Sequence, residues 1–531
     1  MGILSIENLS FRYPNSQKKV LDGLSLDIRA GEFVVLFGET GCGKSTLFKL
    51  IKKELSPTGE ESGDVVFRGK NKRELSLRES AEEIGFVMQD PENQIVTDKV
   101  WHELSFYMEN LSYPPEKIAA RVGELSNYFG ITPWFRRDTV HLSGGQKQLL
   151  TLASVMTVFP SLLILDEPTS RLDPIATKDF ISTLKRINAE LGVTVLMCEH
   201  RLEEVLPVAD KVAFMRGGKI EKCGAPEEVC AYLAEQGYEE VLPTPSRVWI
   251  NAKGEGKMPL SVKEGRDFLA NMGINKEASE QIVPDNKTTV EMKDVWFRYD
   301  KKDEDVLRGA DFVARENEIV SVVGGNGSGK STMLKLLARL VDPYRGKVLV
   351  GGKNAAKMKK GELYLNNIAY LPQDPSAVFL HDKIKDDLGK GAEEAIKLTG
   401  IEAFLDRHPN DLSGGERQKC AIAKILTVRP KIVLLDEPTK GLDVFAKRDL
   451  IMLLKELKKG RTIVLVTHDV EFAALASDRC SLLFGGELLP PAHPQKFFSD
   501  NCFYTTSASR MARGYIKGAV TCEQIMKETE E

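Results

Sequence analysis

The sequence has no long apolar run, and this absence excludes one class of protein. Among its 531 residues, no stretch approaches the roughly 18–20 consecutive apolar residues that a membrane-spanning helix needs. The N-terminus also lacks the pattern of a secretory signal, because Leu4, Ile6 and Leu9 begin a strand-like pattern directly after the first methionine. We therefore expect a chain that stays in the cytosol.

Cysteine is scarce and scattered. The eight cysteines stand at positions 42, 198, 223, 230, 420, 480, 502 and 522, and no two of them form a C-x-x-C pair. This spacing supports neither a zinc site nor an iron–sulfur cluster, and it suits a reducing compartment.

A surplus of charge of one sign is also missing. The sequence holds 73 Lys and Arg residues against 77 Asp and Glu residues, a formal net charge of −4. Proteins that bind nucleic acid or anionic lipid in bulk usually show a clear basic excess, so neither partner is expected. The length implies two or more domains, because single hydrophobic cores stop growing near about 250–300 residues.

What the sequence does contain is an internal repeat. Four segments, LSIENLSFRY, GETGCGKST, LSGGQKQ and LILDEPTSRLD, begin at positions 4, 38, 142 and 163. They return as VEMKDVWFRY, GGNGSGKST, LSGGERQ and VLLDEPTKGLD, which begin at positions 290, 324, 412 and 433. Equivalent residues are 284 apart at Gln89 and Gln373 but 270 apart at Ser143 and Ser413. The chain is therefore a duplicated domain, and its second copy is 14 residues shorter in this one segment.

The repeat sets the expected domain plan. We expect the first copy at residues 1–235 and the second at 289–486. Prolines and glycines interrupt residues 236–288, which predicts a partly ordered linker with a short helix near 262–272. Residues 487–531 form a C-terminal extension, whose aromatic and aliphatic residues predict packing but identify no chemistry.

Each copy contains a glycine-rich loop between an apolar strand and a helix. In the first copy, the apolar residues 33–37 lead into the pattern G-x-x-x-x-G-K-S, and a helical pattern follows. Glycines let backbone N–H groups point at phosphate oxygens, the lysine reaches the β- and γ-phosphates, and the serine binds Mg²⁺. A glycine-rich turn that only starts a helix is the alternative, but two copies at a common spacing favour phosphate binding. The predicted phosphate-binding residues are Gly38, Gly41, Gly43, Lys44, Ser45 and Thr46, with Gly324, Gly327, Gly329, Lys330, Ser331 and Thr332 in the second copy.

An acidic pair follows an apolar strand in each copy. Asp166 and Glu167 form the first pair, and Asp436 and Glu437 form the second. Carboxylates at the C-terminal edge of a parallel strand lie beside the phosphate loop, where ligands collect. We predict that the two aspartates coordinate Mg²⁺, directly or through water, and that the two glutamates polarise the attacking water. An acidic pair that merely caps the next segment is the alternative, which the repetition disfavours.

Two further polar positions recur at strand ends. His200 and His468 each follow an apolar strand, where the ring is placed to contact the γ-phosphate and orient the water. A lone histidine is more often a structural residue, so the repetition is what favours function here. Gln89 and Gln373 also follow apolar residues and are candidate Mg²⁺ ligands.

An aromatic residue ends the first strand of each copy. Tyr13 and Tyr299 hold this position, and an aromatic face there can stack on a purine. Without the repeat, each would be interpreted as an ordinary strand-end tyrosine.

The segment LSGGQ, repeated as LSGGE, supplies a second anion site. A serine followed by two glycines at a helix start offers a hydroxyl and exposed N–H groups. One nucleotide can then be held between two copies that face head to tail. The predicted residues are Ser143, Gly144, Gly145 and Gln146, with Ser413, Gly414, Gly415 and Glu416 in the second copy.

This ordered and repeated set of motifs resembles the ATP-binding cassette (ABC) ATPases over residues 1–230 and 289–485. The resemblance implies an α/β fold of two tandem ABC nucleotide-binding domains, each with a RecA-like P-loop core, an antiparallel β subdomain and a helical subdomain. It implies ATP and Mg²⁺ as cofactors, and it makes Asp173 and Asp443 the D-loop aspartates. It also implies two composite ATP sites, with Lys44, Glu167 and His200 opposite Ser413 and Gly415, and Lys330, Glu437 and His468 opposite Ser143 and Gly145.

Part of the first copy is similar to the ATPases of energy-coupling factor (ECF) importers. The segment that starts at Gln89 is Q-D-P-E-N-Q, Val100, Glu103 and Phe106 follow, and the run EHRLEEVLPVAD occupies 199–210. The similarity implies that ATP hydrolysis powers import of a vitamin, precursor or metal ion. The implied partners are a transmembrane coupling (T) subunit and a substrate-binding (S) membrane subunit, which selects the substrate. They would hold the chain at the cytoplasmic face of the cell membrane.

The second copy departs from this pattern. After Gln373, Asp374 and Pro375 it lacks the second glutamine, and it is shorter before its signature motif. We therefore expect the helices after Gln89 and Gln373 to offer unequal docking surfaces to the T subunit.

A soluble tandem ABC ATPase that acts on ribosomes is the alternative from a different class. Such proteins resemble this chain in length and duplication, but they typically carry a long charged helical arm between the cassettes. Residues 236–288 are too interrupted to form that arm, and the basic clusters 70–73 and 357–360 are more typical of solvated loops than of RNA contacts. A DNA-repair ABC ATPase would need a long coiled-coil insertion or zinc modules, which the sequence lacks, so no nucleic-acid partner is expected.

Overall fold

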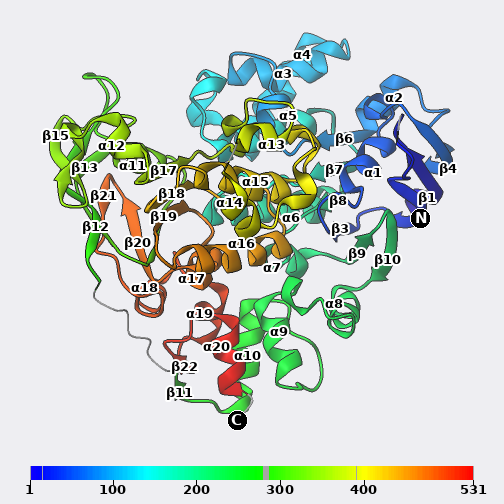
Figure 1. Ribbon diagram of the computed structural model, residues 1–531. Helices are drawn as coiled ribbons and strands as arrows, with labels where there is room; N and C mark the ends of the chain where they lie inside the picture. Colours follow the sequence, from blue (N-terminus) through cyan, green and yellow to red (C-terminus); the bar gives the residue numbers. More distant parts are fainter. Residues whose placement is uncertain (1, 15, 279–285, 390, 530–531) are drawn as a thin grey trace. The chain divides into compact units, whose positions relative to one another are not determined.

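The computed structural model describes residues 2–14, 16–278, 286–389 and 391–529 (Figure 1). The chain divides into two compact units, Met1–Pro243 and Thr244–Glu531, and both units are built from the same two kinds of sheet. No described helix combines the length and the apolar character that crossing a membrane requires.

The first unit contains a six-stranded sheet whose strand ends carry the motifs. Its strand order is β10-β9-β3-β8-β7-β6, and all neighbours are parallel except the edge pair β9 and β10. Strands β6, β7 and β8 are buried along their whole length, as expected for apolar strands covered on both faces. The bounds are β3 (Phe33–Gly38), β6 (Ile84–Val87), β7 (Leu162–Asp166), β8 (Thr194–Cys198), β9 (Lys211–Arg216) and β10 (Lys219–Gly224).

A four-stranded antiparallel sheet packs against the same core. Its order is β2-β1-β4-β5, with β1 (Gly2–Arg12), β2 (Leu21–Arg29), β4 (Glu60–Phe67) and β5 (Lys70–Asn71). One apolar cluster joins Leu4 and Ile28 of this sheet to Val34 of β3 and to Phe48 of helix α1 (Lys44–Ile51). The helix that follows the first phosphate loop is therefore fixed between the two sheets.

Seven further α-helices lie in the described residues of the first unit. They are α2 (Leu77–Glu83), α3 (Val100–Asn110), α4 (Pro115–Tyr128), α5 (Gly144–Val155), α6 (Pro174–Leu191), α7 (Leu202–Val205) and α8 (Pro226–Glu235). Helix α3 contacts both α4 and α5, and the three form the helical subdomain.

The second unit repeats this architecture. Its larger sheet has the order β17-β18-β19-β14-β20-β21, and its antiparallel sheet has the order β13-β12-β15-β16. The strands are β12 (Thr288–Phe297), β13 (Leu307–Arg315), β14 (Ile319–Val323), β15 (Arg345–Val350), β16 (Lys353–Asn354), β17 (Ile368–Leu371), β18 (Ile432–Asp436), β19 (Thr462–Thr467), β20 (Arg479–Phe484) and β21 (Glu487–Leu488). The helices are α11 (Lys330–Leu337), α12 (Lys360–Tyr364), α13 (Ile384–Leu388), α14 (Glu393–Thr399), α15 (Gly414–Leu426), α16 (Val444–Leu457) and α17 (Val470–Ala476).

The length difference between the copies lies in the helical subdomain, as the spacing of the motifs predicts. Helices α3 and α4 have 11 and 14 residues, whereas their counterparts α13 and α14 have 5 and 7. The two sheets of each unit and these helices confirm the expected fold of two cassettes, each with a RecA-like core, an antiparallel β subdomain and a helical subdomain.

The second unit also contains a small helical module, made from residues on both sides of its cassette. Its members are α9 (Thr244–Asn251), α10 (Val262–Met272), β11 (Lys276–Glu277), α19 (Ser507–Ala512), β22 (Ile516–Lys517) and α20 (Cys522–Thr529). Helix α18 (Pro494–Asp500) instead packs on α17 and β20 of the cassette. Helix α9 packs on α20, and α10 packs on α19, so green and red helices lie together in Figure 1. Their shared core includes Val248, Leu269, Met511 and Ile525. The short helix predicted near 262–272 is confirmed.

The module contains two helix pairs with matching contacts. At the start of α10, Glu264 Oε2 accepts hydrogen bonds from the N–H groups of Leu260 and Ser261. At the start of α20, Gln524 Oε1 accepts the same pair of bonds from the N–H groups of the two residues before Cys522. Helices α9 and α10 are thus the counterparts of α19 and α20, and each pair packs on the other.

Candidate nucleotide-binding sites

The glycine-rich loops adopt a backbone that only glycine takes readily. Gly43 and Gly329 precede helices α1 and α11 with φ values of 108° and 103°, in the left-handed region. A Cβ atom on Gly43 would lie 2.9 Å from the carbonyl oxygen of Val20. The loops therefore require glycine here, and they present the first N–H groups of each helix to an anion.

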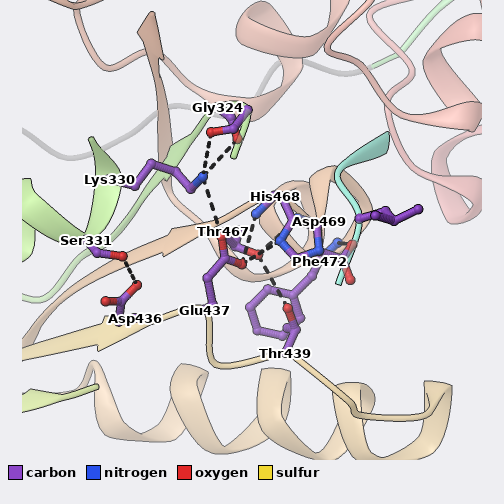
Figure 2. Close-up of polar contacts among 12 residues, drawn as sticks. Gly324, Lys330, Ser331, Asp436, Glu437, Thr439, Thr467, His468, Asp469 and Phe472 are labelled. Carbon is purple, nitrogen blue, oxygen red and sulfur yellow. Dashed lines mark hydrogen bonds and ion pairs between the residues drawn. The ribbon is translucent and has the colours of Figure 1, made fainter. Parts of the chain in front are cut away.

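The loop lysine folds back over its own loop in both copies. Lys44 Nζ donates to the carbonyl oxygens of Gly38 and Glu39 at 2.8 and 3.0 Å. Lys330 Nζ donates to the carbonyl oxygen of Gly324 and to that of the next residue, both at 3.0 Å (Figure 2). Both side chains are buried, so each ammonium group is held at the loop that would carry the phosphates.

A serine hydroxyl and an aspartate carboxylate meet beside each loop. Ser45 Oγ donates to Asp166 Oδ1 at 3.1 Å, and Ser331 Oγ donates to Asp436 Oδ1 at 2.9 Å (Figure 2). Burial raises the pKa of Asp166 to about 6 and also raises the pKa of Asp436. Hydroxyl and carboxylate oxygens are the donors that Mg²⁺ prefers, and the cation would offset the cost of burying the charge, so these residues fit Mg²⁺.

A glutamate and a histidine form a close pair in each unit. Glu167 Oε1 lies 2.7 Å from His200 Nε2, and Glu437 Oε2 lies 2.8 Å from His468 Nδ1. Both glutamates have left-handed backbones, with φ values of 44° and 47°, a rare conformation that clusters at functional sites. Burial alone would raise the pKa of Glu437, but His468 and Lys330, whose Nζ is 3.5 Å away, outweigh burial and lower it. Glu437 is therefore held as a carboxylate, the form that a general base requires.

The two predicted glutamines, Gln89 and Gln373, differ in their surroundings. Gln89 Nε2 donates to Glu167 Oε2 at 2.8 Å, so Gln89, Glu167 and His200 form one connected chain of side chains. Gln373 follows β17 at the equivalent position, while Glu437 is paired with both His468 and Lys330.

The strand-end tyrosines lie next to the phosphate loops. Tyr13 and Thr46 share a hydrogen bond of 3.1 Å between their hydroxyls, and Tyr299 and Thr332 share one of 3.0 Å. Each ring packs edge-on against the phenylalanine two residues earlier, at 4.9 Å between centroids. Because Tyr13 is 36% exposed and Tyr299 57%, a ring face remains open for a purine.

The signature serines cap a helix in each helical subdomain. Ser143 Oγ accepts from the N–H of Gln146 at the start of α5, and Ser413 Oγ accepts from the N–H of Glu416 at the start of α15. The side chains of Gln146 and Glu416 accept from the N–H groups of the serines in return, which completes a capping box. Each signature thus presents a helix N-terminus.

Asp173 and Asp443 cap the helices that follow the acidic pairs. Asp173 Oδ1 accepts from the N–H groups of Ile175 and Ala176, and Asp443 Oδ1 accepts from the N–H of Ala446. These bonds fix the backbone between the acidic pair and α6 or α16.

The sequence interpretation missed two contacts near the sites. Tyr370 Oη donates to Asp436 Oδ2 at 3.1 Å. At the spacing of 284, the residue equivalent to Tyr370 in the first copy is Phe86, so a comparison of the two copies would have singled out this tyrosine. Arg171 and Asp90 form a two-pronged ion pair at 2.7 and 2.6 Å. No sequence signal joins these two residues, because only the fold brings them together.

The fold and these contacts define a P-loop ATPase with two cassettes. The family described as ABC transporter matches residues 21–170 and 307–440. An ABC transporter ATP-binding protein of Bacillus cereus is 40% identical over 538 residues, which cover 98% of this chain and 97% of the relative. Another from Methanosarcina mazei is 31% identical over 524 residues, covering 92% of this chain and 88% of the relative. The chain therefore belongs to the ABC transporter family of ATP-binding proteins, whose cassettes bind ATP with Mg²⁺.

A solved structure shares this tandem architecture at low sequence identity. It is the complex of an archaeal ribosome recycling factor with a ribosomal stalk protein, and it aligns with a TM-score of 0.60 at 22% identity. The alignment covers 93% of this chain and 91% of that chain. At this identity the likeness concerns the fold alone.

Proposed function

We propose that this chain hydrolyses ATP at two composite sites and powers import of a small molecule through an ECF-type membrane complex. The chain docks on a T subunit beside an S subunit, at the cytoplasmic face of the cell membrane. Three observations support this proposal. The relatives that cover nearly the whole chain are ABC transporter ATP-binding proteins, and the segment after Gln89 carries the ECF-like pattern. That segment also exposes apolar side chains.

The proposed roles follow from the contacts within each unit. The phosphate loops and their lysines bind the phosphates, and Tyr13 and Tyr299 stack on the adenine. Asp166 and Asp436 hold Mg²⁺ with the loop serines and the glutamines. Glu167 and Glu437 accept the proton of the attacking water, and their histidines orient the water and the γ-phosphate. Ser143 and Ser413, with their glycines, contact the nucleotide of the opposite cassette.

The two-site claim has a direct test. Separate Glu167→Gln and Glu437→Gln proteins remove one general base each, and each should lower steady-state ATP turnover by about 100-fold or more if both sites must act. Phosphate release by the purified chain is the measurement. Wild-type turnover in either variant contradicts the claim.

A buried carboxylate shapes the docking segment in each helical subdomain. Glu103 Oε2 accepts from the N–H groups of Val96 and Thr97 at 3.0 and 2.8 Å. Asp387 repeats this arrangement with Leu380 and the residue after it, at 2.9 and 3.2 Å. The loops so held expose an apolar side chain, Val96 at 68% and Leu380 at 82%. This surface is the single observation that most favours a protein partner at this place.

The apolar surface is larger in the first copy. Trp101 and Val140 add exposed apolar area there, and the N–H of the residue before Val140 bonds the carbonyl oxygen of Asp98, which brings the two segments side by side. At the equivalent spacings, the second copy has Lys385 and Asn410 instead. The two cassettes therefore offer unequal surfaces, which suits an asymmetric membrane partner.

The first docking segment is also tied to the nucleotide motifs. Asp90 pairs with Arg171, two residues before the D-loop aspartate, and Glu92 pairs with Lys147 of the signature helix at 2.7 Å. In the second copy Gly441 occupies the position of Arg171, so the ion pair between Asp90 and Arg171 has no counterpart there. A force on the first docking segment is thus transmitted to both motifs.

A charge placed on this surface tests the proposal. Val96→Glu in a chain co-expressed with candidate T and S subunits should abolish their co-purification and substrate uptake, while the isolated chain keeps its basal ATPase rate. The Leu77 side chain of α2 is exposed to a similar degree, so Leu77→Glu is the matched control. It should change neither co-purification nor uptake. Uptake that continues unchanged with Val96→Glu contradicts docking at this surface.

The ribosome-acting alternative makes a different prediction. A translation factor would co-sediment with ribosomes in the absence of any membrane partner. The likeness to the ribosome recycling factor concerns the fold alone, whereas the relatives at 40% identity are ABC transporter proteins, so we favour import. Nucleotide-dependent ribosome binding by the purified chain would overturn this preference.

A further inference from the structure

The two cassettes hold their magnesium-site aspartates differently. In the second cassette, Ser331 donates to Asp436 Oδ1 at 2.9 Å and Tyr370 donates to Asp436 Oδ2 at 3.1 Å, so both carboxylate oxygens are held. In the first cassette, Ser45 donates to Asp166 Oδ1 in the same way. The residue equivalent to Tyr370 is there a phenylalanine, which has no hydroxyl to donate.

The comparison is close because the surrounding strands match in register. Phe86 pairs with Ile164 across β6 and β7, and Tyr370 pairs with Leu434 across β17 and β18. Each of these partners stands two residues before the aspartate of its cassette. The two sites therefore differ at this point by a single hydroxyl group.

We propose that Tyr370 is a positioning residue that fixes the Asp436 carboxylate for the metal ion and makes the second cassette bind the metal more tightly. A carboxylate that accepts a bond at each oxygen rotates less freely about its Cβ–Cγ bond, so it loses less conformational freedom when a cation binds. Asp166 is held at one oxygen by the corresponding serine and must be ordered by the metal itself. This inference rests on the proposed role of Asp436 in holding Mg²⁺ and does not depend on the proposed import.

Metal affinity can be measured at one cassette at a time. Mn²⁺ replaces Mg²⁺ as an ion visible by electron paramagnetic resonance, and a non-hydrolysable ATP analogue keeps the nucleotide intact. Lys44→Ala weakens nucleotide binding at the first cassette and leaves the second to be titrated, and Lys330→Ala does the reverse. Free Mn²⁺ is followed as protein with bound analogue is added.

Removing the hydroxyl should weaken the metal site without harming the nucleotide pocket. In the Lys44→Ala background, Tyr370→Phe should raise the Mn²⁺ dissociation constant about tenfold, the lower end of the loss seen when a metal ligand loses its hydrogen-bond partner. Binding of the analogue in EDTA should stay unchanged, because the hydroxyl contacts the metal-site carboxylate and not the phosphate loop. An unchanged Mn²⁺ dissociation constant, or an equal loss of binding in EDTA, overturns the proposal.

The first cassette offers the reciprocal experiment. In the Lys330→Ala background, Phe86→Tyr should tighten Mn²⁺ binding, because the added hydroxyl lies in the register from which Tyr370 reaches Asp436. This variant decides the question alone if Tyr370→Phe does not fold. A gain in Mn²⁺ affinity then supports the proposal, and no gain overturns it.

Discussion

The buried carboxylate of Glu103 holds the exposed loop that carries Val96, and its removal should loosen that loop selectively. Glu103 is only 4% exposed, and it accepts three hydrogen bonds, from the N–H groups of Val96 and Thr97 and from the hydroxyl of Thr97. Glu103→Ala leaves these donors without their acceptor but removes little apolar packing. The cassette as a whole should therefore remain folded.

The magnitude follows from the number and type of these bonds. A hydrogen bond to a charged group contributes about 1.5–3 kcal/mol, and bonds that share one acceptor are not additive, so about 3 kcal/mol of local stability is at stake. Since about 1.4 kcal/mol is a factor of ten, the amides of Val96 and Thr97 should exchange with solvent roughly 100-fold faster.

Hydrogen exchange followed by mass spectrometry is the assay, read on peptides that contain residues 95–98. Glu103→Gln keeps one carbonyl acceptor and should give an intermediate rate. Glu109→Ala removes an exposed glutamate from the same helix and serves as the control, with no expected change in this peptide. Unchanged exchange at Val96 and Thr97 in Glu103→Ala, or equal acceleration in the control, refutes the reasoning.

Two further predictions concern the phosphate loop and the helical module. Gly43→Ala should lower nucleotide affinity and cost about 1–3 kcal/mol of stability in thermal unfolding, because its Cβ would meet the Val20 carbonyl at a left-handed φ. Gly123→Ala, in an open helical position, is the control and should be neutral or stabilising. Separate polypeptides of residues 1–278 and 286–531 should co-purify when co-expressed, because α9 and α10 of the first pack on α20 and α19 of the second; independent elution of the two halves in size-exclusion chromatography would count against this packing.

Much of the fold was predictable because the motifs lie at the ends of apolar strands. Runs such as 162–165 are apolar throughout, so a buried parallel strand was the natural interpretation, and its C-terminal edge was the natural place for Asp166. The repetition of each motif then favoured a functional role, since His200 alone would have been interpreted as a structural residue. In both units the loop serine contacts the aspartate and the glutamate contacts the histidine. The roles of these residues in binding and hydrolysis, and the pairing of each loop with the opposite signature, stay predictions.

The rest depended on contacts between residues far apart in the chain. The pairing of Arg171 with Asp90 spans 81 residues, and neither residue belongs to a pattern that names the other. The helical module was missed for a different reason. Its short helices bury small apolar faces around residues such as Val248 and Met511, and periodicity gives no information about which helix covers which face.

The helical module also bears on how the chain came to have two unlike cassettes. Two equivalent helix pairs, each packed on the other, form the arrangement of a symmetric dimer of identical subunits. In such a dimer, every substitution appears twice and must suit both halves at once. A single chain is free of that constraint, and here Phe86 and Trp101 of one cassette correspond to Tyr370 and Lys385 of the other. The helix pairs thus keep matching contacts while the two nucleotide sites differ.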